Sequence, residues 1–154
     1  MKKMIIKQSA GYIKDFDLSE DTILDVVKIN SDHLTKKILR IKSEKGTTYG
    51  IDFSNSDEEL ESGMVIYQDN DKLVVLETIP EDVIVIVPKD INDMGIIAHL
   101  LGNSHKPIEV EDGEIILQYD SVIVDILKNL KIDFAVEKRS LKRALRHANF
   151  AHAH

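Results

Sequence analysis

The stretch Val83-Ile84-Val85-Ile86-Val87 decides the fold of the second half of the chain. A continuous β-branched run of this kind is typical of a strand that is covered on both faces. The segments that follow it predict, in order, helix, strand, strand, helix and strand: residues 90–101, 108–110, 115–119, 121–130 and 132–136. The order βαββαβ is that of the ferredoxin-like split motif.

The first half of the chain has a different rhythm. Short runs rich in Ile, Val, Leu, Tyr and Thr alternate with turn residues, and the predicted strands cover residues 4–13, 23–29, 37–42, 47–53, 64–67 and 73–76. The chain is therefore expected to be α+β, with an all-β domain over residues 1–78 and the ferredoxin-like domain over residues 79–138. Residues 139–154 are expected to form a basic helix and a flexible, histidine-containing tail.

Composition excludes several classes of protein. A net charge of -7 argues against binding to a nucleic-acid backbone, which requires a basic surface. The 154 residues include no cysteine, which rules out a thiolate metal site and fits a cytoplasmic protein, and no apolar stretch approaches a membrane span. Since no catalytic motif is present either, the chain is not expected to be an enzyme.

The turn Leu101-Gly102-Asn103-Ser104-His105-Lys106-Pro107 carries the candidate chemistry. Gly102 and Asn103 tolerate a left-handed backbone and are expected to end the preceding helix, and Pro107 favours an extended Lys106. Rigid elements on both sides would aim the His105 imidazole outward, as suits a metal ligand or a catalytic base. From spacing alone, a polar loop residue without a special role remains the alternative.

The predicted helix over residues 90–101 has two apolar sides. One side is expected to cover the sheet and consists of Ile91, Met94, Ile97, Ala98 and Leu101. Ile96 and Leu100 fall nearly opposite, beside His99, and could face another chain. Cover from the N-terminal domain, or scattered exposure, would account for this pair equally well.

The end of the chain is basic and then rich in histidine. Arg139, Lys142, Arg143 and Arg146 share one face of the helix expected there, which is either a solvated surface or a docking site for an acidic partner. His147, His152 and His154 lie among small alanines, and such tracts are typical of metal binding by imidazole.

Three motifs resemble the C-terminal domain of the urease accessory protein UreE family in order and spacing. They are Asp93-Met94-Gly95, Leu101-Gly102-Asn103-Ser104-His105, and Glu114-Ile115 leading to Gln118-Tyr119-Asp120. The resemblance implies a nickel metallochaperone in which His105 binds nickel at a dimer interface. Ser104 stands where that family has an arginine. The resemblance also implies metal ligands in the C-terminal tail. His152 and His154 match these ligands here, and His147 and His99 are further candidates.

The function expected from this resemblance is delivery of Ni(II) for assembly of the urease active site. Expected partners are a second copy of the chain, the accessory GTPase and the urease apoprotein, with Zn(II) or Cu(II) as competing metals. Two alternatives stay open: a peptide-binding adaptor with incidental metal binding, and a zinc or copper buffer, because imidazole binds copper more tightly than nickel.

Overall fold

A computed structural model describes residues 4–146, whose secondary-structure elements are mostly strands, with two α-helices. The α+β class predicted from the sequence is confirmed. Of the described residues, 4–79 and 140–144 form a first unit, and 80–139 and 145–146 form a second. In this part of the chain, neither helix is both long and apolar enough to cross a membrane.

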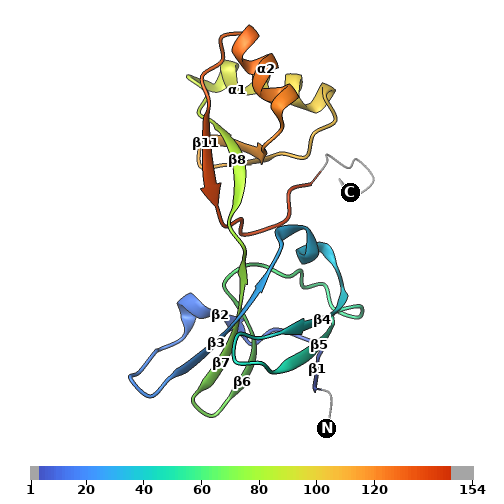
Figure 1. Ribbon diagram of the computed structural model, residues 1–154, viewed down its shortest axis with the longest axis vertical. Helices are drawn as coiled ribbons and strands as arrows, with labels where there is room; N and C mark the ends of the chain where they lie inside the picture. Colours follow the sequence, from blue (N-terminus) through green and yellow to red (C-terminus); the bar gives the residue numbers. More distant parts are fainter. Residues whose placement is uncertain (1–3, 147–154) are drawn as a thin grey trace. The chain divides into compact units, whose positions relative to one another are not determined.

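The first unit contains two sheets (Figure 1). Its strands are β1 (Met4–Ile6), β2 (Gly11–Tyr12), β3 (Ile23–Ile29), β4 (Ile38–Lys42), β5 (Thr48–Asp52), β6 (Met64–Asp69) and β7 (Lys72–Thr78), with short 3-10 helices at Ile13–Asp15 and Ser31–Thr35. The order is β1-β5-β4 in one sheet and β2-β6-β7-β3 in the other. Buried residues from both sheets, including Tyr49, Ile51, Ile66 and Leu76, form one core cluster, so the sheets pack face to face.

The prediction of one strand over residues 4–13 is wrong. Met4–Ile6 pairs with β5 in a parallel register, whereas Gly11–Tyr12 pairs with β6 in the other sheet. Gly11 has a φ of +119°, a conformation that glycine adopts at little cost, and it lies where the chain enters the second sheet.

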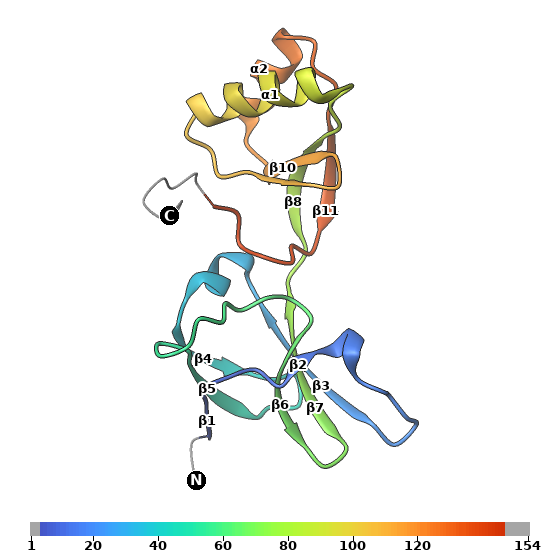
Figure 2. The ribbon, with the colours of Figure 1, turned by 180° about the vertical axis from the view of Figure 1, so that it is seen from behind.

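The second unit has the element order β8 (Glu81–Ile86), α1 (Ile91–Asn103), β9 (Glu109–Glu111), β10 (Glu114–Gln118), α2 (Ser121–Asn129) and β11 (Ala135–Arg139). Its sheet is antiparallel, in the order β11-β8-β10-β9. Figures 1 and 2 show both helices on the same face of this sheet. Ile97 and Leu101 of α1 and Ile123 and Leu127 of α2 are buried there in the same cluster as Ile84.

The apolar side predicted for α1 is only partly correct. Ile97 and Leu101 are buried and Met94 and Ala98 pack against them, but Ile91 is 86% exposed. Ile91 is the first residue of the helix and does not belong to the core cluster, so the buried stripe starts one turn later than the sequence pattern predicted.

The basic helix predicted from residue 139 is not formed within the described residues, since Ser140 to Arg146 contain no helical turn. Instead, Leu141 is 3% exposed and belongs to the first unit. The Thr78 hydroxyl donates to the Leu141 carbonyl (2.6 Å), and the Ser62 amide donates to the Lys142 carbonyl (2.9 Å). These carbonyls are satisfied by the first unit and are not available for helical hydrogen bonds.

Candidate metal centre

Helix α1 ends in a turn that holds His105 in a left-handed conformation. The Ser104 amide donates to the Leu101 carbonyl (3.1 Å), and the His105 amide donates to the Gly102 carbonyl (3.0 Å). His105 itself has a φ of +56°, while Gly102 and Asn103 remain within the helix. The prediction that Gly102 and Asn103 end the helix is therefore wrong by two residues, and the histidine occupies the left-handed position usually taken by glycine.

The His105 side chain is exposed. The next residue, Lys106, connects the His105 turn to helix α2 through an ion pair. Lys106 forms an ion pair with Asp120, the N-cap of α2, which also accepts hydrogen bonds from the Val122 amide (2.8 Å) and the Ile123 amide (3.4 Å). The Lys106 ammonium and the helix amides together lower the pKa of Asp120. Lys106 and Asp120 also line a small pocket of about 130 Å³ with Pro107 and Tyr119.

The Lys106 pair was missed by the sequence analysis. The sequence analysis named Asp120 as part of the third motif, and the structure shows it as the N-cap of α2. Opposite charges fourteen residues apart in different elements follow no periodic rule, so no signal in the sequence pairs them.

His99 lies on the exposed side of α1, one turn before the helix end. Its Nε2 lies 3.5 Å from Nδ2 of the Asn103 side chain. This contact suits an Nε2 that accepts a hydrogen bond and a proton on Nδ1. Within residues 4–146, no three His, Asp or Glu side chains gather into a metal site. A metal bound to His105 would therefore need further ligands from outside the described part of one chain.

The beginning of the tail lies beside the strand that leaves the His105 turn. Arg146 forms an antiparallel bridge with Ile108, three residues after His105. His147, His152 and His154 lie outside the described residues.

An exposed apolar side chain lies on α1, the helix that leads into the His105 turn. Ile96 is 68% exposed, and Leu100, one turn later, is partly buried. Ile96 and Leu100, one exposed and one partly buried, form an apolar strip on the helix surface, and such strips mark candidate contact surfaces.

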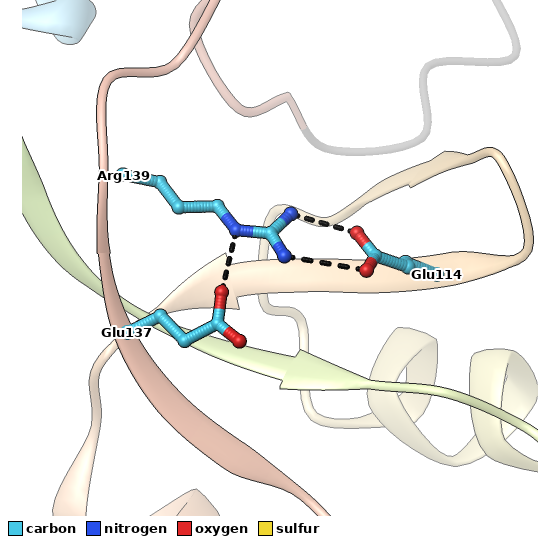
Figure 3. Close-up of polar contacts among 3 residues, drawn as sticks. All are labelled: Glu114, Glu137 and Arg139. Atoms are coloured by element: carbon cyan, nitrogen blue, oxygen red, sulfur yellow. Dashed lines mark hydrogen bonds and ion pairs between the residues drawn. The ribbon is translucent and has the colours of Figure 1, made fainter.

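Figure 3 shows the ion-pair cluster that fixes the end of β11. The Arg139 guanidinium donates to both carboxylate oxygens of Glu114 (2.7 and 3.2 Å), and its Nε donates to Glu137 (2.8 Å). The paired guanidinium lowers the pKa of Glu114, and the two carboxylates raise the pKa of Arg139. The cluster joins β11 to β10 just before the chain passes back to the first unit.

Comparisons with known proteins agree on one family. A family model described as UreE urease accessory protein, C-terminal domain, matches residues 81–154. The chain is 40% identical over 152 residues to the urease accessory protein UreE of Streptococcus vestibularis, covering 98% of this chain and 100% of that protein. It is 39% identical over 151 residues to UreE of Bacillus cereus (strain ATCC 10987 / NRS 248) and 36% identical over 149 residues to UreE of Geobacillus kaustophilus (strain HTA426), covering 97% of this chain and 99% of each relative. These relatives are named as accessory proteins rather than enzymes, in agreement with the prediction that the chain is not an enzyme.

Proposed function

The chain belongs to the UreE family of urease accessory proteins, and on this premise we propose that it is a nickel metallochaperone that delivers Ni(II) for assembly of the urease active site. The observation that carries the proposal is the exposed His105, held on a hydrogen-bonded turn at the end of α1. Neutral imidazole is a good ligand for nickel, and a turn braced by a helix and a strand presents it in one orientation.

The proposal requires a homodimer. One imidazole per chain is a poor site, but a twofold axis beside His105 doubles it. The apolar strip of exposed Ile96 and partly buried Leu100 on the same helix supports a contact on α1. Two His105 side chains leave coordination positions open, and an incomplete set of ligands favours release to a partner over permanent retention.

The tail would supply the remaining ligands. His152 and His154 are the proposed tail ligands, with His147 and His99 as possible additions. The bridge between Arg146 and Ile108 supports this assignment. It pairs Arg146, the residue before His147, with Ile108, which lies three residues after His105. Zn(II) and Cu(II) would compete for the same imidazoles, as the order of metal affinities requires.

We propose the accessory GTPase and the urease apoprotein as partners, in the cytoplasm. Residues 79–138 would bind metal and form the dimer, in the ferredoxin-like arrangement that the strand order β11-β8-β10-β9 supports. Residues 1–78 would be the part that binds a partner or peptide.

A competitive titration tests the proposal. Equilibrium dialysis against nickel, with free histidine as competitor, is expected to give about one nickel per dimer at pH 7.5, the ratio that twofold sharing requires. Binding should weaken as the pH falls through about 6.5, since protonated imidazole has no free lone pair, whereas carboxylate ligands would respond only near pH 4. Affinity that stays constant between pH 7.5 and 5.5 would rule out an imidazole site.

The second candidate function is a peptide-binding adaptor, favoured by a hollow of about 320 Å³ on the sheet β1-β5-β4. Ile5 and Ile38 line it and are 60% and 66% exposed, and Gly50 lies directly between Ile5 and Arg40 in the strand register. An adaptor need not bind nickel stoichiometrically against free histidine, so the same dialysis separates the two functions.

A further inference from the structure

The turn that carries His105 is held by different contacts on its two sides. On the α1 side the Ser104 and His105 amides donate to helix carbonyls, and the Ser104 hydroxyl donates to the Leu100 carbonyl (3.3 Å). On the other side the chain must leave a left-handed residue and enter Pro107 within one residue. That one residue is Lys106, whose ammonium is bound to Asp120.

Both oxygens of the Asp120 carboxylate have a structural role. Oδ1 accepts from the Val122 and Ile123 amides and so caps α2, while Oδ2 accepts from the Lys106 ammonium. The side chains are only partly exposed, 38% for Lys106 and 25% for Asp120. Because its two oxygens already have partners, Asp120 is poorly placed to act as a metal ligand, although its partner Lys106 directly follows His105 in the chain.

We propose that Lys106 and Asp120 are positioning residues for the metal site, which tie the His105 turn to the first turn of α2 and keep the imidazole in its binding orientation. This inference rests on the proposed function of His105 as a nickel ligand. It goes beyond that function by assigning the orientation of the ligand to a specific ion pair between two elements.

The physical reason lies in the backbone of His105. A non-glycine residue at a φ of +56° is in a sparsely populated region and stays there only when its surroundings hold it. Without the ion pair, Lys106 and His105 gain access to other conformations, and that freedom must be lost again when nickel binds. Removal of groups that orient metal-binding residues typically weakens metal affinity by 10 to 100 times, and for this partly exposed pair about tenfold is expected.

Simple electrostatics makes the opposite prediction for one variant. If Lys106 acted only through its charge, Lys106→Met would remove a cation near the metal and strengthen nickel binding. The positioning role predicts weaker binding. Lys106→Met is therefore the decisive variant, and Lys89→Met, which removes an exposed lysine elsewhere in the same unit, is its matched control.

Asp120→Asn separates positioning from helix capping. Asparagine is as good an N-cap as aspartate, so α2 keeps its cap while Lys106 loses its charged partner. Nickel affinity, measured by calorimetry on the full-length dimer, is expected to fall about tenfold in Lys106→Met and in Asp120→Asn, and no further in the double variant. The thermal unfolding midpoint of Asp120→Asn should stay close to that of the parent protein.

Three results would overturn the inference. The first is unchanged or tighter nickel binding in Lys106→Met. The second is weaker binding in Asp120→Asn alone, which would make Asp120 a ligand. The third is a higher nickel count in Lys106→Met, which would mean that a freed Asp120 carboxylate binds metal.

A metal-free measurement distinguishes failure of this inference from failure of the proposed function. Nitrogen-15 relaxation of the His105 amide is expected to show greater mobility in Lys106→Met and in Asp120→Asn than in Lys89→Met. Unchanged mobility contradicts the positioning role whether or not nickel binds. If His105→Ala still binds nickel normally, the proposed function fails, and the relaxation data alone then decide whether the pair positions the turn.

Discussion

At the scale of single residues, His105 combines a proposed nickel ligand with a strained backbone. Its φ of +56° is a conformation that costs an L-residue about 1–2 kcal/mol relative to the right-handed region. The sequence correctly predicted a turn with an outward imidazole, but it assigned the left-handed position to Gly102 and Asn103. Glycine and asparagine adopt the left-handed conformation most readily, yet α1 continues through both residues and ends at Asn103, with Ser104 as its C-cap.

This strain leads to a stability prediction for two variants that both lack the imidazole. His105→Gly should be more stable than His105→Ala by about 1 kcal/mol, because glycine adopts positive φ without a clash and alanine does not. Urea unfolding of the two variants measures the difference. Equal stability would contradict the left-handed assignment of this residue.

At the scale of elements, ion pairs between side chains determine strand ends that the hydrophobic periodicity of the sequence did not predict. The last strand was predicted over residues 132–136 from its apolar residues but forms at Ala135–Arg139. Its end is set by Arg139 and its partners Glu114 and Glu137, and charge pairs of this kind have no hydrophobic signature in the sequence. In contrast, Ile23–Ile29 was predicted at the observed bounds, because a run of apolar residues between turns specifies a strand directly.

The pair of Arg139 and Glu114 predicts an acid-dependent loss of stability. Glu114 has a lower pKa in the folded protein than its usual value of 4.5, so its stabilising effect is present above that pH and is lost as the pH falls through the folded pKa. Glu114→Gln should lower the unfolding temperature at pH 7. Below pH 4.5, the unfolding temperature of this variant should fall less steeply than that of the parent protein. Glu111→Gln, in the same hairpin, is the control and should retain the decline. An identical pH dependence in Glu114→Gln and the parent would refute the assignment.

The segment Ser140–Ala144 predicts a strong effect from a residue near the chain end. Leu141 is buried in the first unit, so Leu141→Ala should destabilise that unit by about 2–3 kcal/mol. Lys142→Ala removes a partly exposed ion pair with Glu61 and should lower stability by less than about 1 kcal/mol. Urea unfolding followed by tyrosine fluorescence reports on this unit through Tyr49 and Tyr67. Similar effects of the two substitutions would show that Leu141 is not part of the core.

At the scale of the whole molecule, the chain passes between its two units more often than its sequence indicates. A change from strands alone to alternating strands and helices marks the passage near residue 79, and the units divide between Ile79 and Pro80. The return of Ser140–Ala144 to the first unit rests on the buried Leu141 and on hydrogen bonds from the Thr78 hydroxyl and the Ser62 amide. A basic run with two leucines resembles an amphipathic helix equally well, so its sequence could not reveal this packing.

The division predicts how the protein can be cut. A fragment from about residue 78 to residue 139 should fold and dimerise at micromolar concentration, because it contains the complete core of the second unit and the apolar strip on α1. Circular dichroism and sedimentation velocity test this. An unfolded or monomeric fragment would contradict the proposed placement of the dimer contact in this unit.

Nickel stoichiometry in two variants tests the central claim most directly. His105→Ala is expected to lose the shared nickel while remaining dimeric, since an exposed turn residue contributes little packing. Truncation after Asn149 removes only the last tail histidines, which lose chain entropy when they bind, so about one nickel per dimer should remain with reduced affinity. If the truncated protein binds no nickel while His105→Ala binds it normally, the tail is the site and the role assigned to His105 is wrong.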